Sequence, residues 1–367
     1  MRHYLDANAS EPIRPAAREA TLAALARAGN PASVHADGRA ARRLLEDARE
    51  ILAARFGAEA GNVVFTSGAT EANALALHAL GADRTTIISA VEHDSLRAAA
   101  PDALVLPVDA QGVADLDALA AILTVSSPAL VCLMLANNET GALQPIQAAA
   151  TLCRRYGALL HVDAVQAAGR CLVDLAALGA HSLALSSHKL GGPLGAGALL
   201  LARDASARPV PLIVGGGQER GWRGGTPALP AIAGFAAAAR LAEPADPLES
   251  LRDAIEAVAR AAGATVCGAG AARLPNTSCL ALPGVRADAQ VMALDLDGIA
   301  VSAGAACSSG KVAPSHVLAA MGLGALAGQA IRVSLPWNTS PADVAAFAAS
   351  YPRMAARLRA ALVPRAA

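Results

Sequence analysis

The segment with the clearest chemical content covers residues 181–193, HSLALSSHKLGGP. Its apolar run ends in hydroxyls, an imidazole and Lys189, and flexible glycines follow immediately. A lysine held at the carboxyl end of a buried strand can form a Schiff base with a carbonyl cofactor, and pyridoxal phosphate (PLP) uses such a lysine. A lysine after a strand is usually a solvated surface residue, so this segment needs complementary groups elsewhere in the chain.

A second segment has the pattern of a phosphate site. In NVVFTSGATEANALAL, residues 62–77, a predicted strand runs into a Ser-Gly turn and then a helix. The amides around Gly68, Ala69 and Thr70, with the Thr70 hydroxyl, would bind a phosphate with help from the helix dipole. The same pattern also fits an ordinary helix cap after a strand, and the segment alone does not decide between them.

A carboxylate follows another apolar strand. Asp163 comes directly after GALLHV, where an unpaired carboxylate would be costly and a pyridinium N–H would be a suitable partner. This pairing would keep the ring nitrogen protonated and make the ring an electron sink for a carbanion at the substrate Cα. Gln166 is close enough in sequence to reach the same ring.

These segments lie among alternating strands and helices from about residue 60 to 202. The predicted strands are NVVFT, TTIISA, ALVCLMLA, GALLHVD, SLALS and GALLLA, and the predicted amphipathic helices are ARRLLEDAREILAARF and QAAATLCRRYG. Uniformly apolar strands separated by helices indicate a mostly parallel sheet covered on both faces. Ligands bind outside the carboxyl ends of such strands, so we expect SGATE, EHDS, NNETG, DAVQ and SSHK to meet in one crevice.

A change of domain is expected near residue 246, where LAEPADP breaks the helical pattern with two prolines. A long helix, PLESLRDAIEAVARAAG, then leads to strand candidates at TVCG, SCLAL and AIRVSL. We therefore predict an α/β protein with a large domain over residues 12–245. Residues 1–11 and 246–367 are predicted to form a smaller α+β domain.

Composition excludes several classes of partner. Lysine plus arginine and aspartate plus glutamate both number 30, so nothing favours binding to nucleic acid or an anionic membrane. The start, MRHYLDANASEP, lacks an apolar signal segment, and no apolar run is long enough to span a bilayer, so a cytoplasmic protein is expected. The six cysteines show no zinc-binding spacing, and no metal site is expected.

Taken together and in order, the motifs resemble those of cysteine desulfurases of the NifS/IscS type, in the class V aminotransferase-fold group of PLP enzymes. The matching segments are YLDANAS near the start, GNPASVHADGR at 29–39, FTSGATEAN at 65–73, VEHDS at 91–95, ANNETGALQPI at 136–146, HVDAVQAAG at 161–169, SSHKLGGPLGAG at 186–197, GGGQERGWRGGTP at 215–227, VSAGAACSSGKVAPSHVL at 301–318 and IRVSL at 331–335. Each motif is weak alone, whereas the ordered set is specific and extends over essentially the whole chain. The resemblance implies the PLP-dependent transferase fold of type I.

The resemblance also implies roles for residues around the PLP ring. Lys189 would carry PLP as a Schiff base, and Asp163 would pair with the pyridine nitrogen. Gln166 would contact the ring hydroxyl, and His93 would stack on the ring face and take part in catalysis. Without the family context, His93 is equally consistent with a structural histidine.

Further residues would bind the phosphate and the substrate. By resemblance, Thr70, Ser186 and His188 would bind the phosphate, with Thr226 reaching across from the other subunit of a homodimer. Asn138 and Arg332 would orient the substrate carboxylate, where the arginine fork gives a bidentate contact. Arg332 taken alone is also consistent with a surface salt bridge.

Cys307 selects the reaction. A thiolate is a strong nucleophile, and the flanking GAACSSGK would let Cys307 move between substrate and acceptor. The family mechanism implies that L-cysteine displaces Lys189 from the cofactor and that the freed amine moves the Cα proton. Cys307 then attacks the substrate sulfur, which leaves a persulfide on the enzyme and releases L-alanine. The sulfur would supply iron–sulfur cluster or other thio-cofactor synthesis through an acceptor protein.

Some positions depart from the family pattern. The start reads ANASEP where many relatives have a Thr-Thr pair, and Pro336 and Trp337 follow IRVSL where a glycine is common. The chain ends soon after MAARLRAALVPRAA, without the longer tail with which relatives dock an iron–sulfur scaffold, so that partnership is not expected. Two other functions stay open: another PLP reaction, such as a selenocysteine lyase or transaminase, and a non-catalytic assembly protein.

Overall fold

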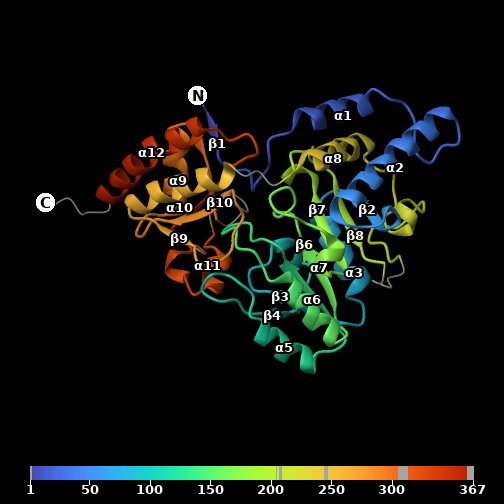
Figure 1. Cartoon of the computed structure of the whole chain (residues 1–367), viewed down its shortest axis with the longest axis horizontal. Helices are drawn as coiled ribbons and strands as arrows, with labels where there is room; N and C mark the ends of the chain where they lie inside the picture. Colours follow the sequence, from blue (N-terminus) through green and yellow to red (C-terminus); the bar gives the residue numbers. More distant parts are fainter. Residues whose placement is uncertain (1, 204, 206–208, 244–246, 305–312, 362–367) are drawn as a thin grey trace.

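A seven-stranded sheet forms the centre of the larger part of the molecule (Figure 1). The computed structural model describes residues 2–203, 205, 209–243, 247–304 and 313–361. Across the sheet the strands are β2 (Val63–Thr66), β8 (Gly197–Leu201), β7 (Ser182–Ser186), β6 (Leu159–Asp163), β5 (Ala129–Met134), β3 (Thr85–Ser89) and β4 (Leu104–Leu106). Neighbouring strands from β7 to β4 are parallel, whereas β8 runs antiparallel to both β7 and β2. The predicted mostly parallel sheet is confirmed.

Both faces of the sheet are buried, which explains why the strands are apolar throughout. On β5, Val131 and Leu133 belong to one core cluster, whereas Leu130 and Cys132 belong to another on the opposite face. Side chains of α3 (Ala69–Leu80) and α4 (Asp94–Arg97) pack in the cluster with Leu130. The first cluster receives side chains from α1 (Pro15–Leu25), α2 (Ala36–Phe56), α5 (Leu116–Val125), α6 (Ile146–Arg155), α7 (Leu175–Leu178) and α8 (Leu229–Leu241).

The smaller part is built on a four-stranded antiparallel sheet. Its strands, in order across the sheet, are β12 (Ser302–Ala303), β13 (Ala330–Ser334), β10 (Thr277–Ala281) and β9 (Thr265–Cys267). Its helices are α9 (Pro247–Ala261), α10 (Ala287–Leu296), α11 (His316–Ala320) and α12 (Pro341–Ala360). Four short 3-10 helices also occur in the described residues, three before residue 247 and one after it: η1 (Ala60–Asn62), η2 (Ser187–Lys189), η3 (Glu219–Gly221) and η4 (Gly324–Leu326).

The N-terminal segment joins the smaller part. Strand β1 (His3–Tyr4) pairs in parallel with β11 (Ile299–Ala300), and Leu5 lies in the core of the smaller part. Figure 1 shows β1 beside the orange and red elements that follow residue 247. This placement agrees with the assignment of residues 1–11 to the smaller domain, although the boundaries stay a prediction. Among the described residues, no helix has the length and apolar character needed to cross a membrane.

The reversed strand β8 shapes the edge where the other strands end. Because β8 is antiparallel to β7 and β2, it starts at the edge where those two strands finish, with Gly197 opposite both Ser186 and Thr66. A Cβ atom at Gly197 would lie 2.5 Å from the carbonyl carbon of Gly68, so the two backbones approach too closely for any side chain. Strands β2, β3, β5, β6 and β7 run in the same direction, so their carboxyl ends lie along one edge of the sheet, where ligands bind in such folds.

A buried ion pair ties the loop after β8 to the sheet. Arg49 and Glu219 form two hydrogen bonds of 2.8 and 2.9 Å, and both side chains are only 2% exposed. Glu219 also accepts from the backbone N–H of Phe65 at 2.8 Å, and Arg49 donates to the Val63 carbonyl at 2.5 Å. Glu219 has a φ of 47°, a left-handed conformation that is costly for a residue with a Cβ atom. The hydrogen bonds from Arg49 and from the Phe65 N–H hold Glu219 in this conformation.

We predict that Glu219→Ala lowers the free energy of unfolding by about 3–5 kcal/mol, because it leaves the Arg49 charge buried without its partner. Chemical and thermal denaturation measure the change. Glu46→Ala is the matched control, since Glu46 also contacts Arg49, at 3.2 Å, but is 43% exposed. That substitution should cost less than about 1 kcal/mol. Equal losses in the two variants would contradict this account of the pair.

Candidate active site

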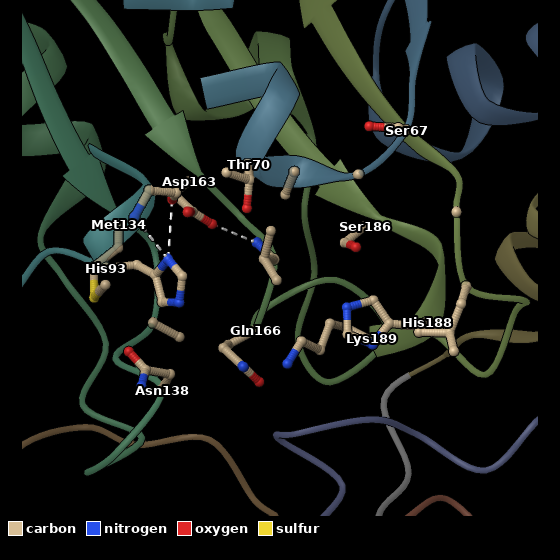
Figure 2. Close-up of a pocket in the computed structure, with 17 residues that line it drawn as sticks. Ser67, Thr70, His93, Met134, Asn138, Asp163, Gln166, Ser186, His188 and Lys189 are labelled. Atoms are coloured by element: carbon tan, nitrogen blue, oxygen red, sulfur yellow. Dashed lines mark hydrogen bonds between the residues drawn. The ribbon is translucent and has the colours of Figure 1, made fainter. Parts of the chain in front are cut away.

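A cavity of about 360 Å³ lies at the edge where the strands end. Its volume is within the range of small-molecule sites. The lining residues come from the ends of β2, β5, β6 and β7, from the starts of α3 and α4, and from the turns before β8: Ser67, Gly68, Ala69, Thr70, His93, Ser95, Met134, Ala136, Asn138, Asp163, Val165, Gln166, Ser186, His188, Lys189, Leu194 and Gly195. Figure 2 shows the labelled side chains around one open space.

Most of the sequence-predicted site residues line this cavity. They are Ala69, Thr70, His93, Asn138, Asp163, Gln166, Ser186, His188 and Lys189. Arg332 lies behind Asn138, to whose carbonyl it donates at 3.2 Å, and does not itself line the cavity. Thr226 lines a neighbouring cavity, and Cys307 is outside the described residues. The expectation that the polar clusters after the strands converge is met by the structure.

Lys189 is a half-buried amine held by backbone oxygens. Its Nζ donates to the carbonyls of Asn8 and Ala9, the second at 2.8 Å. Burial, followed by the positive charges of Arg332 and Arg170, lowers the pKa of Lys189 to about 7. Asp6 and Asp163 act in the opposite direction. A substantial fraction of the amine is therefore unprotonated, and so nucleophilic, at neutral pH.

The start of α3 faces the cavity with free amide groups. Gly68 occupies the N-cap position, and within the described chain no side chain caps this helix end. Ser186 and His188 lie on the cavity wall. Burial, with Lys189 nearby, lowers the pKa of His188 to about 4, so its imidazole is neutral at pH 7. Helix amides, hydroxyls and an imidazole make a group of donors suited to an anion.

Asp163 is buried at the end of β6 and accepts two hydrogen bonds. Its Oδ1 accepts from the backbone N–H of Val165 at 3.0 Å, and its Oδ2 accepts from Asn73 Nδ2 at 2.8 Å. Nearby, Glu92 is fully buried, and this burial, reinforced by Asp163, raises the pKa of Glu92 well above its usual range. This shift favours the neutral form of the Glu92 carboxyl, whose Oε1 accepts from the backbone N–H of Met134 at 2.5 Å.

Gln166 is oriented by groups behind the cavity. Its Nε2 donates to the Asn8 carbonyl at 3.0 Å, and its Oε1 accepts from Arg170 at 2.5 Å. Arg170 is buried and forms an ion pair of 2.9 Å with Glu11, also buried. The side-chain amide therefore has one orientation, which leaves its second N–H for a ligand.

Arg332 on β13 is already paired in this structure. Its guanidinium forms a 2.8 Å ion pair with Asp6, whose other oxygen accepts from Ser302 at 2.7 Å. Arg332 Nε is buried and, within the described residues, has no hydrogen-bond partner. A buried donor without a partner is costly, so Arg332 Nε is an unsatisfied group next to the wall that carries Asn138.

The Thr226 side chain is exposed. It borders a cavity that shares Ser67 and Gly195 with the main site, so it lies near the anion-binding end without lining it. The segment that carries it is tied to α3, because Arg223 forms a 2.9 Å ion pair with Glu71. The proposed contribution of Thr226 to a neighbouring subunit is consistent with this exposure and stays a prediction.

Sequence reasoning missed the groups that orient the site from behind. The Asn8 and Ala9 carbonyls are backbone atoms, which carry no side-chain signal. Asp6 and Arg170 lie inside the motifs YLDANAS and just after HVDAVQAAG, and a charge beside buried apolar residues was the signal available for them. Trp337, which departs from the family pattern after IRVSL, donates from its indole N–H to the Pro12 carbonyl at 2.9 Å.

Comparison with known proteins agrees with the fold. The sequence pattern described as "Aminotransferase class-V" matches residues 3–347. A cysteine desulfurase from Cereibacter sphaeroides is 43% identical, over 98% of this chain and 97% of the relative. An IscS-like cysteine desulfurase from Mycobacterium tuberculosis is 38% identical, over 99% and 98% of the two chains. The solved structure of a NifS-like protein from Rickettsia africae superposes with a TM-score of 0.90 at 33% identity, over 96% of this chain and 99% of that one.

The chain therefore belongs to the class V aminotransferase family, a family of enzymes with the fold predicted above. Within that family it groups with the cysteine desulfurases, as its ordered motifs predicted. This membership does not by itself assign a role to any individual residue of the cavity.

We predict that the apoprotein reacts with pyridoxal at Lys189 at a rate that rises through pH about 7, because addition requires the unprotonated amine and burial lowers the pKa of Lys189 to about 7. Borohydride trapping and peptide mapping measure the rate. Arg332→Leu removes a positive charge, so the midpoint should move to higher pH. Arg353→Leu, which removes an exposed arginine paired with Asp297, should leave it unchanged. A wild-type midpoint near the usual lysine value would contradict the prediction.

Proposed function

We propose that this enzyme is a PLP-dependent cysteine desulfurase that converts L-cysteine to L-alanine and transfers the sulfur to Cys307. The observation that carries the proposal is the amine of Lys189, with a pKa of about 7, in one cavity with the buried carboxylate of Asp163. The sulfur would then pass to an acceptor for iron–sulfur cluster or other thio-cofactor synthesis.

The residues that line the cavity fit PLP group by group. The amides at the start of α3, with Thr70, Ser186 and His188, would bind its phosphate. Asp163 would pair with its ring nitrogen, Gln166 would contact its ring hydroxyl, and His93 would cover its face. Lys189 would hold its aldehyde carbon covalently. When bound there, PLP supplies an electron sink for negative charge at the substrate Cα.

The substrate would be held by groups on the side of the smaller domain. Its carboxylate would bind Arg332, whose buried Nε lacks a partner among the described residues, and the nearby Asn138. The amine of Lys189, once free, would take the proton from Cα and return it later in the reaction. A lysine with a pKa of about 7 is suited to both transfers at neutral pH.

Cys307 would accept the sulfur. As its thiolate forms the S–S bond, the bond between the substrate Cβ and sulfur breaks, and its electron pair stays with the carbon. Protonation of that carbon gives L-alanine, and the persulfide stays on Cys307. The atoms and electrons balance without an external oxidant. This role rests on the sequence motif, since Cys307 lies outside the described residues.

A homodimer with shared sites is part of the proposal. The segment before Thr226 exposes several apolar side chains, Val210, Leu212, Ile213 and Val214. Apolar side chains clustered on one exposed segment favour burial against another chain. A second copy seated on this segment would bring its Thr226 to the phosphate end of the neighbouring cavity.

We predict that the purified protein with PLP forms alanine and sulfide from L-cysteine in the presence of a reductant, and that Cys307→Ser abolishes both. A serine hydroxyl is scarcely ionised and is a poor sulfur acceptor, while PLP binding should persist. Amino-acid analysis, sulfide assay and the visible spectrum measure these outcomes. Cys171→Ser is the matched control, because Cys171 is half-buried and lies outside the cavity lining. Alanine formation at the normal rate by Cys307→Ser would contradict the mechanism and favour another PLP reaction.

We predict that mixing Lys189→Ala with Thr226→Ala chains restores PLP binding to intact sites. In a mixed dimer one site carries both lesions and the other carries neither, so random pairing should restore roughly a quarter of all sites. Titration of PLP against the mixture, with each single variant alone as the control, measures the recovery. A strictly monomeric active enzyme would rule out shared sites.

A further inference from the structure

Behind the side of the cavity that contains Asp163, the buried side chain of Asn73 connects three sequence motifs, FTSGATEAN, VEHDS and HVDAVQAAG. Asn73, on α3, is fully buried. Its Nδ2 donates to Asp163 Oδ2 and to Ser95 Oγ, both at 2.8 Å, and its Oδ1 lies 2.9 Å from His161 Nε2. A buried amide is costly unless its partners are complete. Here the side chain makes three hydrogen bonds, two with residues of β6 and one with Ser95 of α4.

The direction of these hydrogen bonds is fixed by the chemistry of the partners. Turning the amide over would point Asn73 Oδ1 at the Asp163 carboxylate, so the N–H groups must face Asp163 and Ser95. His161 must then carry its proton on Nε2, and its Nδ1, 2.8 Å from Ser182 Oγ, accepts from that hydroxyl. Burial lowers the pKa of His161 to about 3, so the ring is neutral.

The same chain of hydrogen bonds reaches His93. Ser95 Oγ accepts from Asn73, so its own hydrogen can be donated to His93 Nδ1 at 3.0 Å. The backbone N–H of Ser95 also donates to Nδ1, at 3.1 Å. A nitrogen that accepts two hydrogen bonds carries no proton, so neutral His93 has its proton on Nε2. In Figure 2 the His93 ring faces the open space between Asp163 and Asn138.

We propose that Asn73 is a positioning residue, which holds the Asp163 carboxylate in its orientation and, through Ser95 Oγ, adds a second hydrogen bond to His93 Nδ1 beside the one from the Ser95 backbone N–H. Among the described side chains, Asn73 is the one that donates to Asp163. His161 and Ser182 act through Asn73 by fixing which end of its amide faces the site. This inference rests on the proposed function, in which Asp163 contacts the ring nitrogen and His93 the ring face.

The first test is independent of catalysis. In the ¹⁵N spectrum of the apoprotein, assigned by comparison with His93→Gln, the wild-type His93 signal should be that of the Nε2–H tautomer. Asn73→Ala leaves Ser95 Oγ without its donor, so the hydroxyl can turn away from His93 Nδ1, which then keeps only the hydrogen bond from the Ser95 backbone N–H. The His93 Nδ1 signal should therefore shift while the Nε2–H tautomer persists, and an unchanged Nδ1 signal in Asn73→Ala would overturn the coupling of Asn73 to His93.

The second test separates positioning from mere stability. In Asn73→Ala, kcat for alanine formation should fall roughly ten- to a hundredfold, as for other residues that orient a reacting group from behind. KM for L-cysteine should stay within about threefold, because Arg332 and Asn138 are untouched. His161→Phe removes the N–H that donates to Asn73 Oδ1 and so fixes the orientation of the Asn73 amide. This variant should also lower kcat, by less than Asn73→Ala does. His161→Gln keeps an N–H near the Nε2 position and should restore most of kcat.

Gln290→Ala is the control for stability alone. Gln290 is a buried amide on α10, far from the cavity lining, and donates to the carbonyls of Val285 and Gln329. It should lower the melting temperature while leaving kcat and the His93 signal unchanged. If Asn73→Ala behaves like Gln290→Ala, Asn73 is structural only and the proposal is wrong. If the wild type itself forms no alanine, the proposed function fails, and the apoprotein spectrum still tests Asn73.

Discussion

The arrangement of the site depends on the bond between the Lys189 amine and the backbone of the N-terminal segment. The Asn8 carbonyl accepts from both Lys189 and Gln166, and the Asn8 amide donates to the Asn138 carbonyl at 3.1 Å and to Thr277 at 3.0 Å. Asn8 thus links Lys189 in the turn after β7, the cavity residues Gln166 and Asn138, and Thr277 on the smaller sheet. The position of the amine is therefore set by the relative placement of the two parts of the molecule.

The N-terminal segment also supplies the charges that balance the site. Burial first, and then the buried arginines Arg332 and Arg170, lower the pKa of Lys189, and each arginine is paired with an acid from this segment, Asp6 or Glu11. Without those acids, two uncompensated cations would stand close to the amine, at a cost of several kcal/mol each. The segment therefore gives the arginines partners while leaving enough positive potential to keep much of the lysine unprotonated.

Much of the fold and of the cavity wall could be predicted from the sequence, since both follow from local patterns. Apolar runs gave the strands, and polar residues at the strand ends, such as Asp163 and Lys189, pointed to the edge where they meet. Strand β4 was missed because it is only three residues long and lies between prolines, although ALVL is apolar; Leu104 and Val105 are exposed. The ion pair of Asp6 with Arg332 joins residues at opposite ends of the chain, so no local pattern can reveal it.

The antiparallel pairing of β7 and β8 has a consequence for the order in which the chain folds. Lys189 lies in the loop between β7 and β8, which pair directly, with Ser186 opposite Gly197. Because this loop is short, bringing the two strands together costs little chain entropy and does not require distant segments. The groups that lower the pKa of Lys189 come from far along the chain, as Arg332 does, and close over it later. Until those distant groups close over it, the amine is solvated and has the pKa of an ordinary lysine, so it becomes a nucleophile at neutral pH only when the two parts of the molecule have come together.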